Sequence, residues 1–271
     1  MNATTLRIRK PLDFKVDASK LLPAALAVLS SDELTRFALS DANCVLGDLF
    51  DIMQADADAP SLTIEGDASW LDHLGAKMNE GTLTVRGNAG DYTGFGMNGG
   101  ALRVHGDAGI FTACEMQNGR VTIHGNTGDF AAGALPGHME GMSGGVLTIE
   151  GNAGARLADR MRRGTVLVTG NAGDFAASRL IAGTVCIGGK VGAHLGYGMR
   201  RGTVLLLQTP PRIPPTFTVG GHGFEVFWRL FTRTLSREIA PFVTLDQRAL
   251  PVRHAGDLAV DGRGELLIAK S

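Results

Sequence analysis

The sequence predicts an all-β-dominated protein: a right-handed parallel β-helix of about seven coils, with a small N-terminal α/β cap and a C-terminal helix-containing segment. Three observations lead to this prediction. A short unit recurs with a 19-residue period, each copy alternates aliphatic and polar residues, and a glycine closes each alternation. The 38 glycines follow this period, and they therefore indicate a repeat architecture rather than low complexity.

The repeat is clearest at residues 80–90, which read EGTLTVRGNAG. The related segments are GGALRVHGDAG at 99–109, NGRVTIHGNTG at 118–128, GGVLTIEGNAG at 144–154 and RGTVLVTGNAG at 163–173, with weaker copies from residues 182 and 201. The first glycines of successive copies lie 19, 19, 26, 19, 19 and 19 residues apart. The 26-residue gap therefore holds an insertion of seven residues, which we place within the loop 130–144.

Each unit contains one short predicted strand. The second and fourth residues after the first glycine are aliphatic in every copy, as Leu83 and Val85 are, and the residues between them are mostly polar. This period of two predicts a strand with one buried side. A unit of 19 residues cannot bury that side alone, so we expect successive units to stack about 4.8 Å apart with their aliphatic residues in internal ladders. The absence of an aliphatic residue at every sixth position disfavours a left-handed hexapeptide helix, and we predict the right-handed form.

The ends of the chain differ from the array at 61–208. Residues 1–60 are predicted to form a cap of short strands and helix, with helix-like spacing at 17–37, a second short helix capped by Ser31 or Asp32, and a strand at 43–52. Residues 209–271 contain a proline-rich linker at 210–215, an amphipathic helix at 224–240 and a short final strand. We expect the amphipathic helix to cover the open end of the stack.

Charge, cysteine spacing and apolar content argue against several classes of protein, namely nucleic-acid-binding, zinc-binding and membrane proteins. The formal net charge of -1 gives no electrostatic reason to expect nucleic-acid binding. Cys44, Cys114 and Cys186 have no CxxC spacing, which argues against a zinc site and fits a reducing compartment. No apolar run approaches the ~20 residues of a membrane span, and the N-terminal residues lack a signal-peptide core. We therefore expect a cytoplasmic protein without a membrane association.

The sequence offers weak candidates for chemistry. Arg86, His105, His124 and Glu150 share one repeat position and should form a column, in which the last three could chelate zinc. A solvated or interface-facing column of alternating charge is the favoured interpretation. Three aspartates that share the position after the glycine turn are expected to bind backbone N–H groups rather than to act as a catalytic carboxylate set. We assign no catalytic, cofactor-binding or metal-binding residue.

Partner binding is predicted where the period fails. The inserted loop offers an adaptable apolar surface, and the amphipathic helix adds one aromatic residue to the hypothesis. The predicted partner-binding residues are Leu135, Pro136, His138, Met139, Met142 and Trp228.

The repeats, the inserted GALPGHMEGMSGG and the final RHAGDLAVDGRGELLIA together resemble a known family. They are similar to the C subunit of formylmethanofuran dehydrogenase and to that of its bacterial relative, the formyltransferase/hydrolase complex of methylotrophs. The array alone also resembles the GXGXG domain of glutamate synthase. The resemblance covers nearly the whole chain.

The resemblance implies a β-helix subunit that has no active site or cofactor of its own and that holds catalytic partners together. These partners would be an amidohydrolase-like chain, a formyltransferase chain and a molybdopterin-subunit-like chain. The bacterial complex would transfer a formyl group from formyl-tetrahydromethanopterin to a methanofuran analogue and release formate, in formaldehyde oxidation and one-carbon metabolism.

Three alternatives remain at this point. One is a subunit of the archaeal molybdenum- or tungsten-dependent dehydrogenase. Another is a stand-alone β-helix enzyme that acts on a polymer, which would need His105, His124 and Glu150 in an outward groove. The third is a channel domain of the glutamate synthase type, which the terminal segments disfavour.

Overall fold

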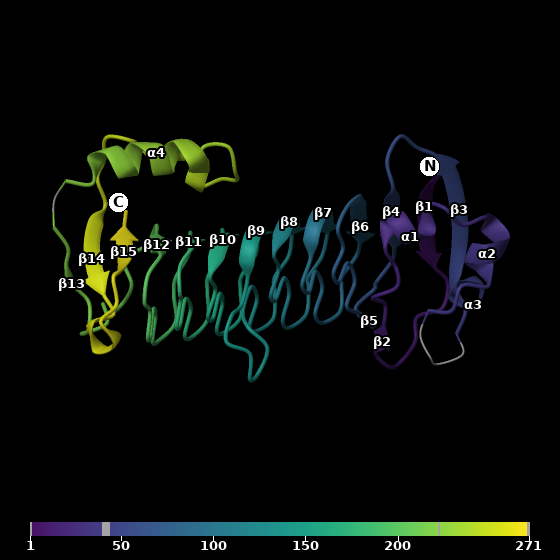
Figure 1. Cartoon of the computed structure of the whole chain (residues 1–271), viewed down its shortest axis with the longest axis horizontal. Coiled ribbons are helices and arrows are strands. Elements are labelled where there is room, and N and C mark those ends of the chain that lie inside the picture. The colour runs from purple at the N-terminus through teal and green to yellow at the C-terminus, as the bar shows by residue number, and fades with distance from the viewer. Residues whose placement is uncertain (1, 40–43, 222, 270–271) are drawn as a thin grey trace.

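A computed structural model describes residues 2–39, 44–221 and 223–269. Residues 1, 40–43, 222, 270 and 271 belong to the predicted terminal segments and lie outside the described residues. One 13-stranded sheet dominates the chain, in the order β13-β14-β15-β12-β11-β10-β9-β8-β7-β6-β4-β1-β3 (Figure 1). The coarse prediction of a mostly parallel, all-β-dominated fold is therefore confirmed.

The central strands come from successive sequence units and lie parallel, each beside the strand of the next unit. They are β4 (Ser61–Glu65), β6 (Thr82–Arg86), β7 (Asn98–Val104), β8 (Asn118–Ile123), β9 (Ser143–Ile149), β10 (Arg163–Val168), β11 (Thr184–Ile187) and β12 (Thr203–Leu206). The register places equivalent repeat positions opposite each other, so that Leu83 faces both Leu62 and Leu102. Figure 1 shows the resulting stack along the long axis of the molecule.

The aliphatic residues of each strand face the interior, as the period of two predicts. Leu83, Val85, Leu102 and Val104 are fully buried, and the equivalent residues of the later strands join the same cluster. The first glycine of each unit is required by both conformation and space. Gly145 has φ +81°, and a Cβ there would lie 2.8 Å from the carbonyl oxygen of Gly119. Close stacking of the backbones therefore fixes glycine at this position.

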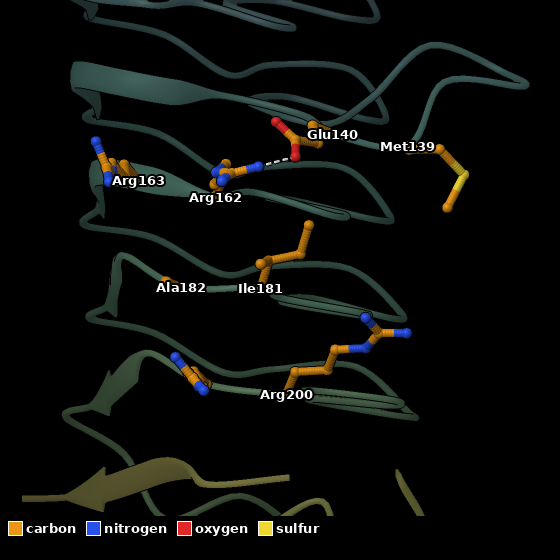
Figure 2. Close-up of a pocket in the computed structure, with 8 residues that line it drawn as sticks. Met139, Glu140, Arg162, Arg163, Ile181, Ala182 and Arg200 are labelled. Carbon is orange, nitrogen blue, oxygen red and sulfur yellow. Dashed lines mark hydrogen bonds and ion pairs between the residues drawn. The ribbon is translucent and has the colours of Figure 1, made fainter.

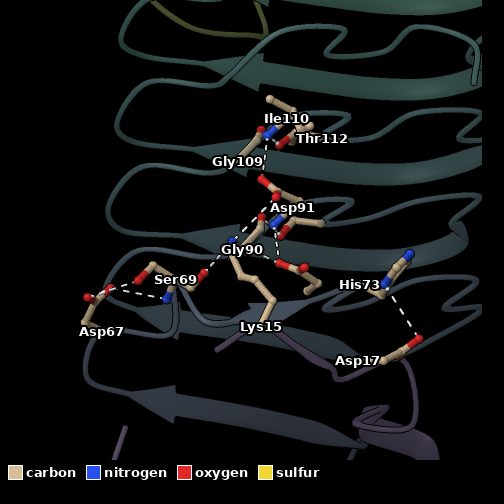
Figure 3. A network of polar contacts seen from close by, with 12 residues as sticks. Lys15, Asp17, Asp67, Ser69, His73, Gly90, Asp91, Gly109, Ile110 and Thr112 are labelled. Atoms are coloured by element: carbon tan, nitrogen blue, oxygen red, sulfur yellow. Dashed lines mark hydrogen bonds and ion pairs between the residues drawn. The ribbon is translucent and has the colours of Figure 1, made fainter. Parts of the chain in front are cut away.

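Polar side chains bond one unit to the next at the turns. The N–H of Asp107 donates to Oδ1 of Asn88 (2.9 Å), and the same contact recurs along the stack. A second ladder is formed by aspartates: the N–H of Ile110 donates to Oδ1 of Asp91 (3.0 Å, Figure 3), and Asp129 and Asp174 accept in the same way. The predicted backbone-bonding role of these aspartates is confirmed.

The N-terminal segment extends the sheet by two strands. β1 (Asn2–Ile8) pairs in parallel with β4 and antiparallel with β3 (Phe50–Asp56), and the short β2 (Val16–Asp17) pairs with β5 (Leu71–Asp72). Helices α1 (Pro23–Leu26), α2 (Ser31–Thr35) and α3 (Leu46–Leu49) pack here. Asp17 lies beside His73 at this end of the array (Figure 3).

Two local predictions for this segment differ from the structure. The cap of α2 is Ser30, whose hydroxyl accepts from the N–H of Glu33 while the Glu33 carboxylate accepts from the Ser30 N–H. This reciprocal capping box explains why the helix begins one residue earlier than expected. The predicted strand at 43–52 begins at Phe50, because Leu46 and Leu49 are buried in a helical turn; residue 43 lies outside the described residues.

The C-terminal segment continues the sheet and adds one longer helix. β15 (Gly264–Ile268) pairs in parallel with β12, and β14 (Val252–Gly256) and β13 (Thr218–Val219) follow antiparallel. The helix α4 (Glu225–Leu235) and the 3-10 turns η1 (Phe242–Thr244) and η2 (Leu258–Val260) complete it.

Helix α4 does not cover the open end of the stack, so that prediction is wrong. It lies along the outer face of the sheet, where Trp228 and Leu235 pack against outward side chains of successive strands (Figure 1). Those side chains are Leu167, Cys186, Leu205 and Leu267. At the equivalent position the earlier strands carry polar residues, as Thr84 and Arg103 show. The helix covers the part of the face that would otherwise expose leucine to water.

Within the described ranges, none of the helices has the length and apolar character that crossing a bilayer would require.

Candidate functional site

Two neighbouring cavities of about 550 and 480 Å³ lie beside the inserted loop, on the second half of the array. We call them together the arginine groove. Its residues include Met139, Glu140, Arg160, Arg162, Arg163, Arg179, Ile181, Ala182, Arg200 and Arg201. Figure 2 shows the first cavity, with its side chains on successive layers of the stack.

The repeat itself builds this groove. Arg162, Ile181 and Arg200 each stand two residues before the first glycine of a unit, and Arg163, Ala182 and Arg201 stand one residue before it. Because the units stack in register, two arginine pairs are held ~9.6 Å apart, which is two layers of about 4.8 Å. The apolar layer of Ile181 and Ala182 lies between them (Figure 2).

The charges of the groove are only partly compensated. Arg162 is paired with Glu140, and Arg179 binds the buried Asp159 through Nε (3.0 Å) and through a second nitrogen (2.6 Å). The side chains of Arg163, Arg200 and Arg201 are exposed and have no polar partner among the described residues. An uncompensated set of guanidinium groups makes the groove attractive to anions.

The inserted loop is tied to the array at both of its sides. Glu115 lies against the N-terminal side: its Oε1 accepts from the N–H of Leu135 (3.1 Å) and contacts Nδ1 of His138 (2.6 Å). On the C-terminal side, Arg160 donates to the carbonyl oxygen of His138, in addition to the pair between Arg162 and Glu140. The loop is therefore held in place beside the groove.

The predicted partner-binding residues divide into exposed and buried groups. Met139 is 73% exposed and borders both cavities, and Pro136 and His138 are exposed on the same loop. Leu135 is half-buried. Met142 is fully buried and belongs to the internal methionine ladder, because it stands three residues before the first glycine of its unit.

Trp228 is also placed in the interior. It is 1% exposed, its ring packs on the outward leucines of the sheet, and its Nε1 donates to the carbonyl oxygen of Asp246 (3.1 Å). The exposed face of α4 instead carries Val226 and Leu230. The structure therefore brings Met139, His138 and Pro136 together and leaves Met142 and Trp228 away from the surface.

Asp257 forms the buried wall of the second cavity. Its Oδ2 accepts from the N–H of Gly198 (2.9 Å) and its Oδ1 from the N–H of Ala259 (3.0 Å). Burial raises the pKa of this carboxyl, but the hydrogen bonds from the Thr216 side chain and from these two N–H groups outweigh burial and lower the pKa overall. These hydrogen bonds stabilise the negative charge of Asp257, whose carboxylate links Ala259 of η2 to Gly198 of the last unit.

The column of His105, His124 and Glu150 lies just beyond the C-terminal ends of three neighbouring strands. The two imidazole rings lie 5.0 Å apart, and Nδ1 of His124 lies 2.9 Å from Oε1 of Glu150. Among the residues that the structure describes, no group of three or more histidine, cysteine, aspartate or glutamate side chains is arranged to hold a metal ion. Arg86 at the head of the column pairs with Glu65 instead (3.0 Å).

Two of the cysteines are poor candidates for nucleophiles. Burial strongly raises the pKa of the Cys114 and Cys186 thiols, and the Glu115 charge adds to this effect at Cys114. A thiol with a raised pKa carries little thiolate, which is the reactive form.

Comparison with known proteins identifies the family to which this chain belongs. The family model of the GXGXG motif matches residues 50–215, which is more than half of the chain. This chain belongs to the GXGXG family. The match includes the inserted loop and all the groove arginines, whereas α4, β14 and β15 lie beyond it.

Within the GXGXG family, this chain is similar to two curated proteins over about a third of their length. The C subunit of the formyltransferase/hydrolase complex Fhc of Methylorubrum extorquens is 42% identical over 89 residues, 32% of this chain and 33% of that protein. The C subunit of the tungsten-containing formylmethanofuran dehydrogenase 2 of Methanococcus maripaludis is 29% identical over 94 residues, 34% of this chain and 35% of that protein.

A solved structure extends the similarity to nearly the whole chain. One chain of the formyltransferase/hydrolase complex (FhcABCD) from Methylorubrum extorquens, determined with methylofuran, is 39% identical with a TM-score of 0.89, and the match covers 98% of this chain and 100% of that one. The resemblance to the C-subunit family that the sequence indicated is therefore confirmed.

Sequence reasoning missed the arginine groove of this GXGXG protein. The signal was present, because Arg162, Arg163, Arg200 and Arg201 fall on two equivalent positions of the repeat. The periodicity of the strand and turn positions reveals the interior, whereas the groove depends on the two positions just before the first glycine, which lie outside that pattern.

Proposed function

We propose that this chain is a non-catalytic scaffold subunit of a formyltransferase/hydrolase complex in one-carbon metabolism. The observation that carries the proposal is the match over 98% of the chain, at 39% identity, to a chain of such a complex. The partners would be amidohydrolase-like, formyltransferase and molybdopterin-subunit-like chains. The assembled complex would move a formyl group from formyl-tetrahydromethanopterin to a methanofuran analogue and release formate, in the cytoplasm of a methylotroph.

The scaffold in this proposal is a right-handed parallel β-helix of about seven coils over residues 61–208, between an N-terminal cap at 1–60 and a C-terminal segment at 209–271. The in-register parallel strands support this architecture. The repeated aspartates support a structural rather than a catalytic surface, because their carboxylates accept N–H groups of the next unit. No cofactor is assigned to the chain.

The alternative assembly is the archaeal dehydrogenase, and one observation favours it: the similarity to the C subunit of the Methanococcus maripaludis enzyme. The bacterial relative is the more similar of the two, at 42% against 29% identity over alignments of comparable length. We therefore propose the formyltransferase/hydrolase complex rather than the archaeal dehydrogenase as the assembly to which this chain belongs.

The test is affinity purification of the tagged chain from its own organism, followed by identification of the bound chains. We expect the three partner types named above, formyl transfer and formate release by the assembled complex, and neither activity in the isolated chain. Activity of the isolated chain would contradict the scaffold role. Purification without any partner, or with a tungsten- or molybdenum-containing chain that oxidises the formyl group, would reject the hydrolase assembly.

A further inference from the structure

The arginine groove has the chemistry of a carboxylate-binding surface. Arg163, Arg200 and Arg201 are exposed and lack polar partners among the described residues, although the whole chain has a formal net charge of -1. Glu140, the one acidic residue of the first cavity, is already paired with Arg162. Guanidinium groups bind carboxylates through two parallel N–H bonds, so the groove is complementary to an acidic ligand.

The equivalent positions in the first half of the array carry no positive charge. There the two residues before the first glycine are Asn79 and Glu80, then Asn98 and Gly99, and then Gln117 and Asn118. Asn79, Asn98 and Gln117 border a separate cavity. The backbone of the repeat does not require arginine at these positions, and the arginine pairs are therefore a property of the second half alone.

The spacing of the groove distinguishes between possible acidic ligands. The two arginine layers stand ~9.6 Å apart, with an apolar layer midway. In an α-helix lying along the stack, residues i and i+7 are about 10.5 Å apart on one face, and residues i+3 and i+4 lie midway between them. In an extended strand the residues on one face recur every ~6.6 Å, which does not match the arginine layers. A small inorganic anion would leave the apolar layer of Ile181 and Ala182 uncovered.

Met139 adds an apolar rim at the edge of the groove, beside Glu140 and level with Arg162 (Figure 2). Its side chain lies at the edge of the groove in Figure 2 and borders both cavities. The residues on either side of it, His138 and Glu140, are tied to the array through Arg160 and Arg162. A loop whose backbone is already held in place loses less conformational entropy on binding than a free loop.

We propose that the arginine groove binds an acidic amphipathic helix of a partner subunit. The helix lies along the stack with carboxylates at positions i and i+7 on the two arginine layers and with an apolar residue at i+3 or i+4 on Ile181 and Ala182. Met139 borders the helix at the rim of the groove. The identity of the partner as a member of the complex rests on the proposed function. The chemistry of the groove does not depend on it.

The first experiment uses the complex. The tagged chain with Arg163→Glu and Arg201→Glu is purified from its own organism and compared with the wild type and with Arg103→Glu, a charge reversal at an exposed arginine on β7 that has no polar partner among the described residues. We expect the double variant to recover at least one partner about tenfold less, and Arg103→Glu to recover it normally. Exposed substitutions of this kind leave stability nearly unchanged, which circular dichroism melting would verify.

Normal recovery of every partner by the double variant, at all salt concentrations that the wild type tolerates, would overturn the proposal. Equal loss in the Arg103→Glu variant would also overturn it, because the effect would then reflect overall charge. If the wild type itself recovers no partner, the proposed function fails. The second experiment alone then tests whether the groove binds an acidic helix.

The second experiment uses the full chain and a fluorescein-labelled helical peptide with Glu at i and i+7 and Leu at i+3 and i+4. Anisotropy titration compares this peptide with a shuffled peptide of the same composition. We expect the designed peptide to bind at least tenfold more tightly than the shuffled one to the wild type, and to lose that difference with Arg163→Glu and Arg201→Glu. Equal binding of the two peptides would overturn the helical proposal and indicate non-specific attraction.

A charge-preserving variant sharpens the result. Arg163→Lys with Arg201→Lys keeps the positive charge but cannot form the paired N–H contacts of guanidinium. We expect an intermediate affinity for the designed peptide. Affinity as low as that of the glutamate variant, with unchanged melting, would still support arginine-specific recognition, whereas unchanged affinity would reject paired contacts.

Discussion

In the first half of the array, from β4 to β8, the outward position in the middle of each strand carries threonine or arginine, as Thr84 and Arg103 show. In β10, β11 and β12 of the second half, and in β15 beside them, the same position carries Leu167, Cys186, Leu205 and Leu267, and α4 covers it. The inward positions are aliphatic in both halves. Stacking thus dictates the interior everywhere and leaves the surface free to differ.

The edge of the array beside the inserted loop changes at the same point. Asparagine and glutamine line it before the inserted loop, and arginines line it afterwards. The loop and the strand that follows it, β9, which still carries Thr148 at the outward position, therefore separate a polar half from a half that has a helix on one face and a cationic groove at one edge. This difference suggests that the specific contacts of the protein are concentrated in the second half.

The largest expected effect concerns the helix on the second half. Trp228→Ala should reduce the free energy of unfolding by about 3–5 kcal/mol, because it empties a buried site against the outward leucines. Amide hydrogen exchange of α4 and urea unfolding would measure the change. The matched control is Phe227→Ala on the same helix, which is 39% exposed and should cost clearly less. Equal effects would show that the outward leucines do not hold the helix.

The next effect tests whether the two halves share one interior. Leu102→Ala in β7 and Leu206→Ala in β12 remove fully buried side chains of the same cluster. Each should cost about 2–5 kcal/mol by urea unfolding, with similar values in the two halves. A much smaller cost in one half would break the comparison, since it would mean that the interior of that half can collapse around the cavity.

A smaller effect is expected at Asp257, which ties the end segment to the last unit. Its pKa is lowered in the folded protein, so its stabilising contribution is present above the unfolded pKa of about 3.9 and is lost as pH falls through the folded pKa. Asp257→Asn keeps one of the two accepting oxygens and should cost about 1–3 kcal/mol at pH 7. Urea midpoints measured down to low pH would check this: the difference from the wild type should shrink as Asp257 is protonated, and a constant difference would reject the charged-state explanation.

The smallest effect concerns the ion pair between the halves. Arg120 on β8 contacts Glu238, just beyond α4, at 2.8 Å. A double-mutant cycle with Arg120→Ala and Glu238→Ala should give a coupling free energy of about 0.2–1 kcal/mol, reduced by salt. A larger coupling that salt does not reduce would indicate that the first half also helps to position the helix.

The repeating part of the fold was predictable because its residues face the same environment in every unit. The aliphatic pair of each strand and the backbone-bonding aspartates were assigned correctly from their repeat positions. The closing glycines were expected to bend with positive φ, but only Gly66 among them does so, and it is the first glycine of each unit, such as Gly145, that has positive φ. At the ends, the helix start at Ser30 follows from a local capping box with Glu33, whereas burial of Leu46 and Leu49 depends on what the segment packs against. Propensity alone does not show that Leu46 and Leu49 are buried.

The sequence by itself determined the stack: strand length, register and interior follow from a 19-residue period in which glycine is required wherever backbones approach closely. Only the tertiary structure decided which surfaces are covered. The sequence predicted Trp228 to bind a partner, whereas the structure buries it against the outward leucines. Two arginine pairs that are 38 residues apart in the chain line one groove. The physical reason is that contacts within a repeat are local and periodic, whereas burial by a distant helix and the summation of charge across layers depend on the arrangement of the whole chain.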